Sequence, residues 1–346
     1  MDSRRLTVLG RIAVFACAPY LTLKLLWVLG FDVGVVDTHR VSRAVWVAAN
    51  AFTFLLDAIA AVVAHTLTRP AGRRAPAWLL AFPLWMASGL LVPLITGVVG
   101  GSLAALVTGA VNPMSRGDFL APWVVCVVYG GFIIEGGTLL GAFAVYAHQR
   151  WGGLLRRPLG ALPDTGTRAL QRIFLAPAAV LLATLGTVHV LWGAGSTLGM
   201  EAAEVAASTV ISSASDWAQG LFTLLGAAGI LLLLFPRLRP RLPVRIPLAL
   251  AWVGSASAFA LGGTLWLGQA VADGLSLGAS AVPGGLPGLV SALELFAGLV
   301  VLCGGAFTLC ELTTLCELTA AARTQERSAF SSAHRHAREC ATADDR

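Results

Sequence analysis

Residues 77–99 read AWLLAFPLWMASGLLVPLITGVV, a stretch without a charged side chain. A helix that crosses a bilayer needs about 20 mostly apolar residues, because the hydrocarbon core is about 30 Å thick and a helix rises about 1.5 Å per residue. The stretch therefore predicts a membrane-spanning helix. Further apolar runs of similar length lie at 9–30, 44–66, 119–146, 173–194, 215–235, 246–268 and 287–312. Together they predict an all-α, polytopic transmembrane bundle of about eight spans.

The composition of the whole chain also indicates that lipid, and not water, surrounds most of it. Of its 346 residues, 57% are hydrophobic and 12% are charged, with a mean hydropathy of +0.78. Soluble globular domains carry roughly 25% charged residues. A chain with so few charges does not cover a water-exposed surface, so a bilayer must surround most of it.

The basic residues are almost all arginine, with Lys24 the one lysine, a bias typical of high-GC bacterial genomes. The arginines gather at the N-terminus, in the tail and in the even-numbered connections at 67–76, 147–172 and 236–245. Excess basic charge marks the cytoplasmic side. We therefore expect a multi-pass protein of the bacterial plasma membrane with both termini in the cytoplasm.

The same distribution indicates the partner of these arginines. They are spread over every helix end on one face, where they can contact the anionic headgroups of the lipid bilayer. They do not form one stripe with interleaved aromatic residues, so nucleic acid is not an expected partner. A membrane or cytoplasmic protein partner stays an open alternative.

Two spans carry the same short motif. Thr22 to Gly30 and Thr187 to Gly195 share the pattern Thr-x-basic-x-Leu-Trp-x-x-Gly, position for position. The motif predicts two parallel four-helix halves, related by an axis along the membrane normal. A coincidence of composition is the alternative. The expected organisation is a first half at 1–147, an arginine-rich linker at 148–172, a second half at 173–319 and a disordered polar tail at 320–346.

A weaker match would extend this repeat by aligning Gly136-Gly137 with Gly304-Gly305. The Glu135-Gly136-Gly137 sequence also predicts a locally weakened helix, in which a carboxylate meets exposed backbone groups.

Within the motif, Trp27 and Trp192 fall near the outer ends of their spans, where indole rings favour the headgroup zone. Lys24 and His189 lie one turn deeper. One interpretation makes these residues interfacial anchors, with the lysine stem reaching outward to the headgroups. The other places the two basic groups opposite each other in a cavity between the halves.

Ionisable groups inside the spans define the candidate polar site. They are Lys24, Asp57, Glu135, His189 and Glu294. Charges in a bilayer are costly and commonly face a bundle interior or cavity. Lys24 and Glu294 lie at similar predicted depths, so they are a candidate ion pair. A purely structural clamp and a proton or ion pathway through Glu135 and Asp57 both stay open.

No catalytic, metal or cofactor motif is recognisable. The chain has no P-loop, no G-x-G-x-x-G after a strand, no H-E-x-x-H and no G-x-S-x-G. Its six histidines are scattered, so we predict neither a metal nor a cofactor. An intramembrane enzyme stays possible, because its residues can converge in three dimensions.

The stretch from Pro19-Tyr20 through Trp27 to Gly30, together with the arginine-rich connections, resembles uncharacterised multi-span membrane proteins of high-GC actinobacteria. The resemblance covers the hydrophobic architecture, and only the Lys24–Trp27 and His189–Trp192 motifs are specific within it. It implies no activity, ligand or functional residue.

Three functions follow as hypotheses. The first is transport or permeation of a small solute or ion, with the polar site at the interface between the halves. The second is a non-catalytic membrane scaffold or regulatory subunit. The third is an enzyme acting on a lipid-linked substrate through a lateral opening near Glu201, Glu204 and Asp216.

Overall fold

The computed structural model of the protein describes residues 2–39, 42–69, 76–110, 119–163, 166–264, 266–268 and 285–343. Its long helices are α1 (Asp2–Leu29), α2 (Arg43–Leu67), α4 (Ala77–Thr108), α6 (Pro122–Leu155), α7 (Arg168–Gly193), α9 (Val210–Leu234), α10 (Arg245–Ser257) and α12 (Gly285–Ala343). Short elements are η1 (Leu159–Ala161), α8 (Ala202–Ala207), η2 (Pro236–Leu238) and the π-helix η3 (Ala258–Thr264), which continues α10.

The predicted bundle of eight spans is confirmed. Eight helices among the described residues are long and apolar enough to cross a membrane. Their outer surfaces carry large apolar side chains such as Phe15, which is 75% exposed, and Leu106, which is 80% exposed. Such a surface suits lipid and would be unfavourable in water. The chain is therefore an integral membrane protein.

Local sequence signals set several helix starts. Ser42 accepts a hydrogen bond from the backbone of Val45 and caps α2. Thr209 and Ser212 form a reciprocal capping box that starts α9, and Pro122 occupies the first turn of α6. These residues satisfy or remove the amide donors that a helix start leaves free.

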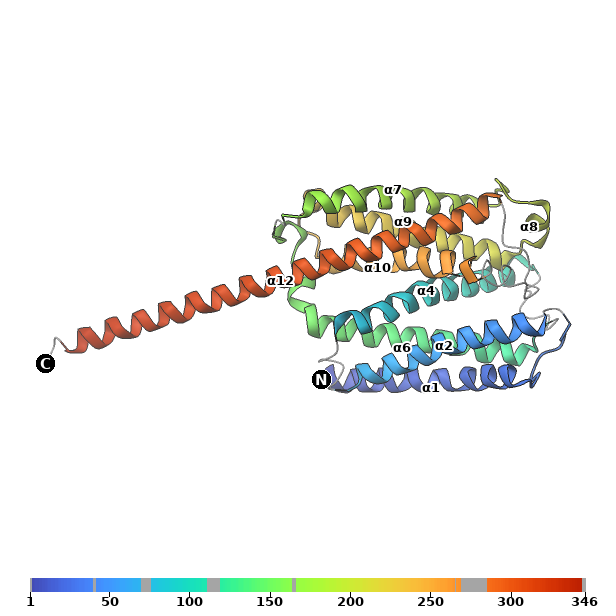
Figure 1. Ribbon diagram of the computed structural model, residues 1–346, viewed down its shortest axis with the longest axis horizontal. Helices are drawn as coiled ribbons and strands as arrows, with labels where there is room; N and C mark the ends of the chain where they lie inside the picture. Colours follow the sequence, from blue (N-terminus) through green and yellow to red (C-terminus); the bar gives the residue numbers. More distant parts are fainter. Residues whose placement is uncertain are drawn as a thin grey trace.

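The eight helices pack as two groups (Figure 1). In the first, α1 packs closely against both α2 and α6. In the second, α9 packs against α7 and α10, and α12 packs against α7 and η3. Each group has its own cluster of buried apolar side chains, the larger ones centred on Leu84 and Leu182.

Helix α4 joins the two groups, because it follows α2 in the chain but packs most extensively against α9 and α10. Small residues allow this close approach. A Cβ atom at Gly97 would lie 2.7 Å from the Ser215 hydroxyl, and one at Gly101 would lie 2.8 Å from the Ile211 Cα. The indole N–H of Trp85 also donates to the Ser255 hydroxyl across this contact, at 3.2 Å.

The helix irregularity lies in a different span from the one that the sequence indicated. The backbone of α6 stays helical through Glu135, Gly136 and Gly137, and its one non-helical residue is Trp151. The prediction of a weakened helix at Glu135 is therefore wrong. Gly136 instead makes room for Leu91 and Ile95 of α4. The irregular segment is η3, where the hydrogen-bond register widens to that of a π-helix.

The C-terminal segment also differs from its prediction. The polar composition of 320–346 predicts a disordered tail, but α12 continues as one helix to Ala343 and extends beyond the bundle (Figure 1). Residues 344–346 lie outside the described ranges. Both chain ends lie at the same end of the bundle (Figure 1), as an even number of spans requires.

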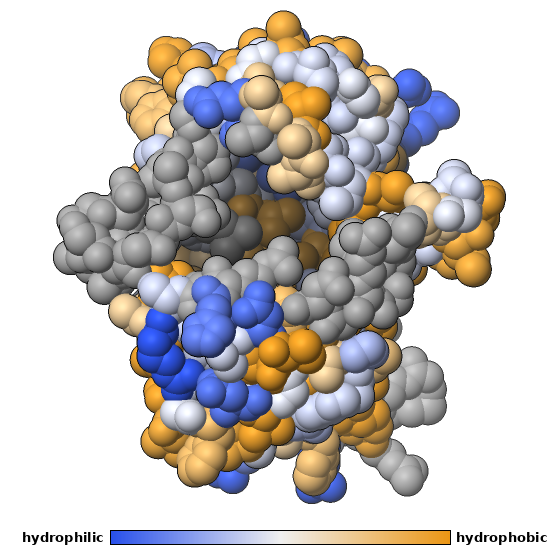
Figure 2. Space-filling view, turned by 90° about the vertical axis from the view of Figure 1, so that its right-hand side faces the viewer, coloured by the Kyte–Doolittle hydropathy of each residue, from blue (hydrophilic) through white to orange (hydrophobic). Residues whose placement is uncertain are grey.

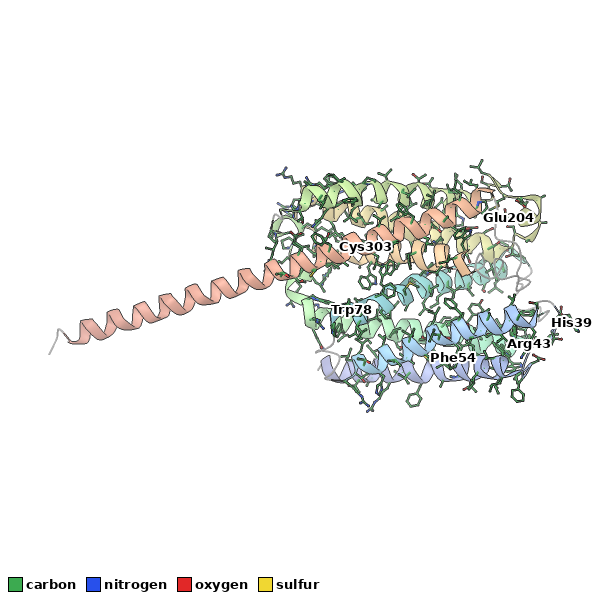
Figure 3. All side chains as sticks on the ribbon, in the orientation of Figure 1. His39, Arg43, Phe54, Trp78, Glu204 and Cys303 are labelled. Carbon is green, nitrogen blue, oxygen red and sulfur yellow. The ribbon has the colours of Figure 1, made fainter. Side chains whose placement is uncertain are left out.

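The two ends of the bundle carry different parts of the chain. The tail end carries both chain ends. The Trp end carries Trp27, Trp192 and α8, and Figure 3 labels His39, Arg43 and Glu204 there. Among the arginines used to predict the orientation, Arg40, Arg73, Arg74, Arg116 and Arg346 lie outside the described residues.

Candidate functional site

The first group of helices buries a cluster that we call the Lys24 trio: Lys24, Asp57 and Glu135. The Lys24 Nζ lies 2.6 Å from the Asp57 Oδ2, and the lysine side chain is 1% exposed. The same Nζ lies 3.7 Å from the centre of the Tyr20 ring, a cation–π contact. Glu135 is 3% exposed and lies within electrostatic range of both partners.

This arrangement corrects two predictions. Lys24 pairs with Asp57 and not with Glu294, and its side chain does not reach out to the headgroups. Side chains lean toward the N-terminus of their helix. Lys24 on α1 and Asp57 on α2 therefore lean toward each other, because the two helices run in opposite directions. Counting residues from the helix ends missed this convergence.

The second group of helices buries the His189 trio: His189, Asp216 and Glu294. The His189 Nδ1 lies 2.9 Å from the Asp216 Oδ1. Its Nε2 is buried and lies 3.3 Å from the Glu294 Oε1, but it makes no hydrogen bond among the described residues. The imidazole thus stands between two carboxylates supplied by α9 and α12.

Neutral polar groups hold Glu294 in place. The side-chain amide of Gln219 donates to the Glu294 Oε1 at 3.0 Å and to the Ser257 carbonyl at 3.2 Å. The Ser257 hydroxyl donates back to the Gln219 Oε1 at 2.6 Å. Glu294 is therefore fixed from α9 and from the end of α10, next to the point where η3 begins.

The second carboxylate oxygen of Glu294, unlike the first, makes no hydrogen bond among the described residues. This oxygen, Oε2, is buried. It lies directly against Gly262 of η3, where an added Cβ would overlap it. Buried unpaired polar atoms are rare, and π-helical segments recur at functional sites.

The members of the His189 trio differ in how much of each side chain is exposed. The side chains of His189 and Asp216 are 13% and 26% exposed, whereas Glu294 is 0% exposed. A pocket of about 70 Å³ at the Trp end is lined by loop residues including Asp32 and Asp37, and by no member of either trio. Figure 2 views this end and shows a hollow between the two halves, with apolar residues in its depth.

The two tryptophans of the motif end their spans in the same way. The indole N–H of Trp27 donates to the Val33 carbonyl at 2.9 Å, and that of Trp192 donates to the Leu198 carbonyl at 3.0 Å. They are 3% and 6% exposed, so these rings pack inside the protein and hold the following turn in place.

The glycines of these turns match as well. Gly30 and Gly34 have φ values of +108° and +72°, and Gly195 and Gly199 have +94° and +70°. Left-handed backbone of this kind favours glycine. Each turn therefore has the same glycine pair and the same indole hydrogen bond.

Replacing either tryptophan with phenylalanine should destabilise the protein by about 1 kcal/mol, because the change removes the part-buried hydrogen bond that holds the turn. SDS titration of the protein in mild detergent, followed by circular dichroism, measures this. Trp78→Phe is the control, because Trp78 is 69% exposed at the start of α4 (Figure 3). Equal stability of all three variants would show that the indole hydrogen bonds contribute nothing.

Two acids proposed for lipid chemistry have a local role. Glu201 and Glu204 form the capping box of α8, in which the Glu204 carboxylate accepts from the Glu201 amide at 2.9 Å. Of the three acids considered at this end, Asp216 alone joins a trio. Across the described residues, no group of three or more His, Cys, Asp and Glu side chains is arranged to hold a metal ion.

All five predicted site residues are therefore in buried clusters, but not in one cluster. Lys24, Asp57 and Glu135 belong to the first group of helices, and His189 and Glu294 to the second. The predicted meeting of basic groups across the interface between the halves is wrong. Sequence reasoning named Asp216 only with Glu201 and Glu204, near a lateral opening, although Asp57 precedes Asp216 by the same interval as Glu135 precedes Glu294.

Because likeness to a known protein could also identify a function, the chain was compared with protein-family models, curated proteins and solved structures, and none of them matched it.

Proposed function

We propose that the protein carries a small solute or ion across the membrane, and that the two trios bind the positive charge that drives or accompanies transport. The observation that carries this proposal is a pair of trios within the spans, each with two carboxylates and one basic group: Asp57 pairs directly with Lys24, and Asp216 and Glu294 both face His189. Ionisable groups at membrane depth commonly mark ion paths and proton relays.

The charge balance supports a binding role. Even with Lys24 and His189 protonated, the carboxylates of each trio outnumber its cation. An uncompensated buried charge costs several kcal/mol. Each trio is therefore more stable once it gains a proton or a small cation. A purely structural clamp would need one acid for each base.

The turn geometry supports duplicated halves as part of this proposal. The matching indole hydrogen bonds and left-handed glycines recur at the same interval along the chain as the motif itself. The two pairs of acids also share one interval, slightly shorter than that of the motif. We therefore align Glu135 with Glu294, in place of aligning Gly136-Gly137 with Gly304-Gly305. Parallel repeats of this kind occur in transporters.

The arginine pattern places the tail end in the cytoplasm of a bacterial cell as part of the same proposal. The arginines there would contact anionic headgroups. In this orientation the Trp end, with the partly exposed Asp216, faces the outside.

Flux measurements test the proposal. Liposomes that contain the protein and a pH-sensitive dye, under an inside-negative potassium diffusion potential, should acidify faster than protein-free liposomes. A mixture of small external solutes covers the case in which proton and solute move together. Glu294→Gln and Asp57→Asn should each lower the rate by about tenfold or more, because each removes an ionisable acid from a trio.

Asp32→Asn is the matched control, because Asp32 pairs with Arg43 at the Trp end and is 47% exposed. Its flux should equal that of the unmodified protein. Transport would be contradicted if the pH changed at the same rate as in protein-free liposomes, with and without solutes, whether the change was an acidification or an alkalinisation.

One observation favours a second candidate, a scaffold or regulatory subunit. The α12 helix continues past the bundle to Ala343, where it could contact a cytoplasmic partner (Figure 1). A chain shortened after residue 319 separates the two functions. Unchanged flux supports transport as the function of the bundle, whereas absent flux together with loss of a bound partner supports the scaffold.

A further inference from the structure

We propose that the positive charge bound by the His189 trio is a proton, which enters at Asp216, passes through the imidazole of His189 and is held on Glu294. The inference rests on the proposed function for its role in transport. The geometry of the three side chains carries the inference itself.

The three groups form a path of decreasing exposure. Asp216 is 26% exposed, His189 is 13% exposed and Glu294 is 0% exposed. Asp216 lies about 9 Å along α9 from its start at the Trp end, and Glu294 lies about 14 Å along α12 from its own start. A proton that moves from Asp216 to Glu294 therefore travels from the edge of the bundle into its interior.

The imidazole is placed for this transfer, because its Nδ1 is hydrogen-bonded to Asp216 and its unpaired Nε2 lies 3.3 Å from the Glu294 Oε1. In a neutral ring one nitrogen donates and the other accepts. The ring takes the Asp216 proton on Nδ1 and gives its Nε2 proton to the Glu294 Oε1. Asp216 becomes a carboxylate, Glu294 becomes a neutral acid, and ring rotation restores the first tautomer. No electrons are transferred.

The surroundings of Glu294 favour a proton over a metal ion. Hard cations require several oxygen ligands around them. The free Oε2 of Glu294 instead lies against Gly262, which leaves no room on that side. An unpaired oxygen is also less costly in a neutral acid than in a buried carboxylate. The neutral acid thus explains both the tight contact and the missing hydrogen bond.

The other charged groups on the helices around the trio have partners elsewhere: Arg168 and Arg172 of α7 donate to the Pro163 and Leu234 carbonyls, and Glu311 of α12 accepts from Thr167 and Gln171. Helix α4 has no ionisable side chain, and α10 carries only Arg245, at its first residue. The remaining contacts of the trio are neutral: Gln219, Ser257 and the Trp192 ring, whose centre lies 5.1 Å from that of His189. A proton in this region therefore has only the three members of the trio to bind.

Infrared spectroscopy of the full chain in liposomes tests the proposal without using transport. A protonated carboxyl has a carbonyl stretch that a carboxylate lacks. The unmodified protein should show such a band, and Glu294→Gln should lose it. Transfer to D₂O shifts the band as deuterium replaces the carboxyl proton. The rate of this exchange should be lower by about tenfold or more in His189→Gln and in Asp216→Asn than in the unmodified protein, because each change breaks the relay.

Asp216→Asn keeps a hydrogen-bonding side chain at the more exposed position, so it supports the test if His189→Gln fails to fold. Glu204→Gln is the control, since Glu204 only caps α8 at the same end, and it should change neither the band nor its exchange. Three results would overturn the proposal: no band attributable to Glu294, loss of the band on adding Na⁺, Li⁺ or K⁺, or exchange unchanged in both relay variants.

These results are distinguishable from failure of the proposed function. A Glu294 band with relay-dependent exchange, in a protein that gives no flux, would leave the proton path in place and remove transport. Flux in a protein whose Glu294 band disappears on adding a metal ion would leave transport in place and replace the proton with that cation.

Discussion

Lys24→Met is expected to destabilise the protein by about 3–5 kcal/mol, because it leaves Asp57 and Glu135 buried without their cation. Methionine keeps most of the volume of lysine, so the loss reports charge and not packing. Adding Asp57→Asn to this variant should recover much of the stability. SDS titration of the single and double variants gives a coupling energy, which we expect to be about 2 kcal/mol.

The exposed pair of Asp32 and Arg43 is the control for this cycle. Its side chains are 47% and 46% exposed, so Asp32→Asn should cost about 1 kcal/mol or less. If Lys24→Met cost no more than Asp32→Asn, the Lys24 trio would not hold buried charge. If Asp57→Asn made Lys24→Met worse, the lost lysine would matter for its packing instead.

The spans were predictable because lipid imposes one requirement along the whole length of a helix. A bilayer accepts only segments that satisfy their own backbone and present apolar side chains. The run at 77–99 meets that requirement without help from any other part of the chain, and α4 covers all of it. Hydropathy alone therefore found each span, although several helices extend further than their apolar runs.

The partners of the buried charges were not predictable by the same reasoning. Residue depth along a helix ignores the direction of the side chain, which is why Lys24 was paired with Glu294. Asp216 stands at the edge of the predicted span at 215–235, but Thr209 starts the helix earlier and places Asp216 inside it. The sequence did contain one signal that Asp216 belongs with these groups: the interval from Asp57 to Asp216 equals that from Glu135 to Glu294.

Hydropathy also carries no information on hydrogen-bond register. The residues of η3, AFALGGT, are as apolar as those of an ordinary span, so the sequence gives no sign of the π-helical form that this segment adopts against α12. Gly262 and Gly263 look like common packing glycines in the sequence. Their neighbours, Glu294 and Leu295, become apparent only when α10 and α12 are placed side by side.

Gly254→Ala is expected to destabilise the protein by about 3 kcal/mol or more, near the upper end of what overpacking costs. An added Cβ would overlap the Phe222 carbonyl and the Gly226 Cα of α9. Both are backbone atoms, so no change of rotamer relieves the clash. The helices must move apart, and that movement would also disturb Ser257, which holds Gln219 next to Glu294. SDS titration measures the loss.

Gly137→Ala is the matched control, because it makes the same chemical change in a span where nothing lies within 4 Å of the added Cβ. Alanine favours a helix over glycine by up to about 1 kcal/mol. The two substitutions should therefore shift stability in opposite directions, which separates helix propensity from helix contact. If both variants were stabilised, α9 and α10 would not meet at Gly226 and Gly254. The support that this contact gives to the Glu294 site would then have to come from the packing of α12 against α7.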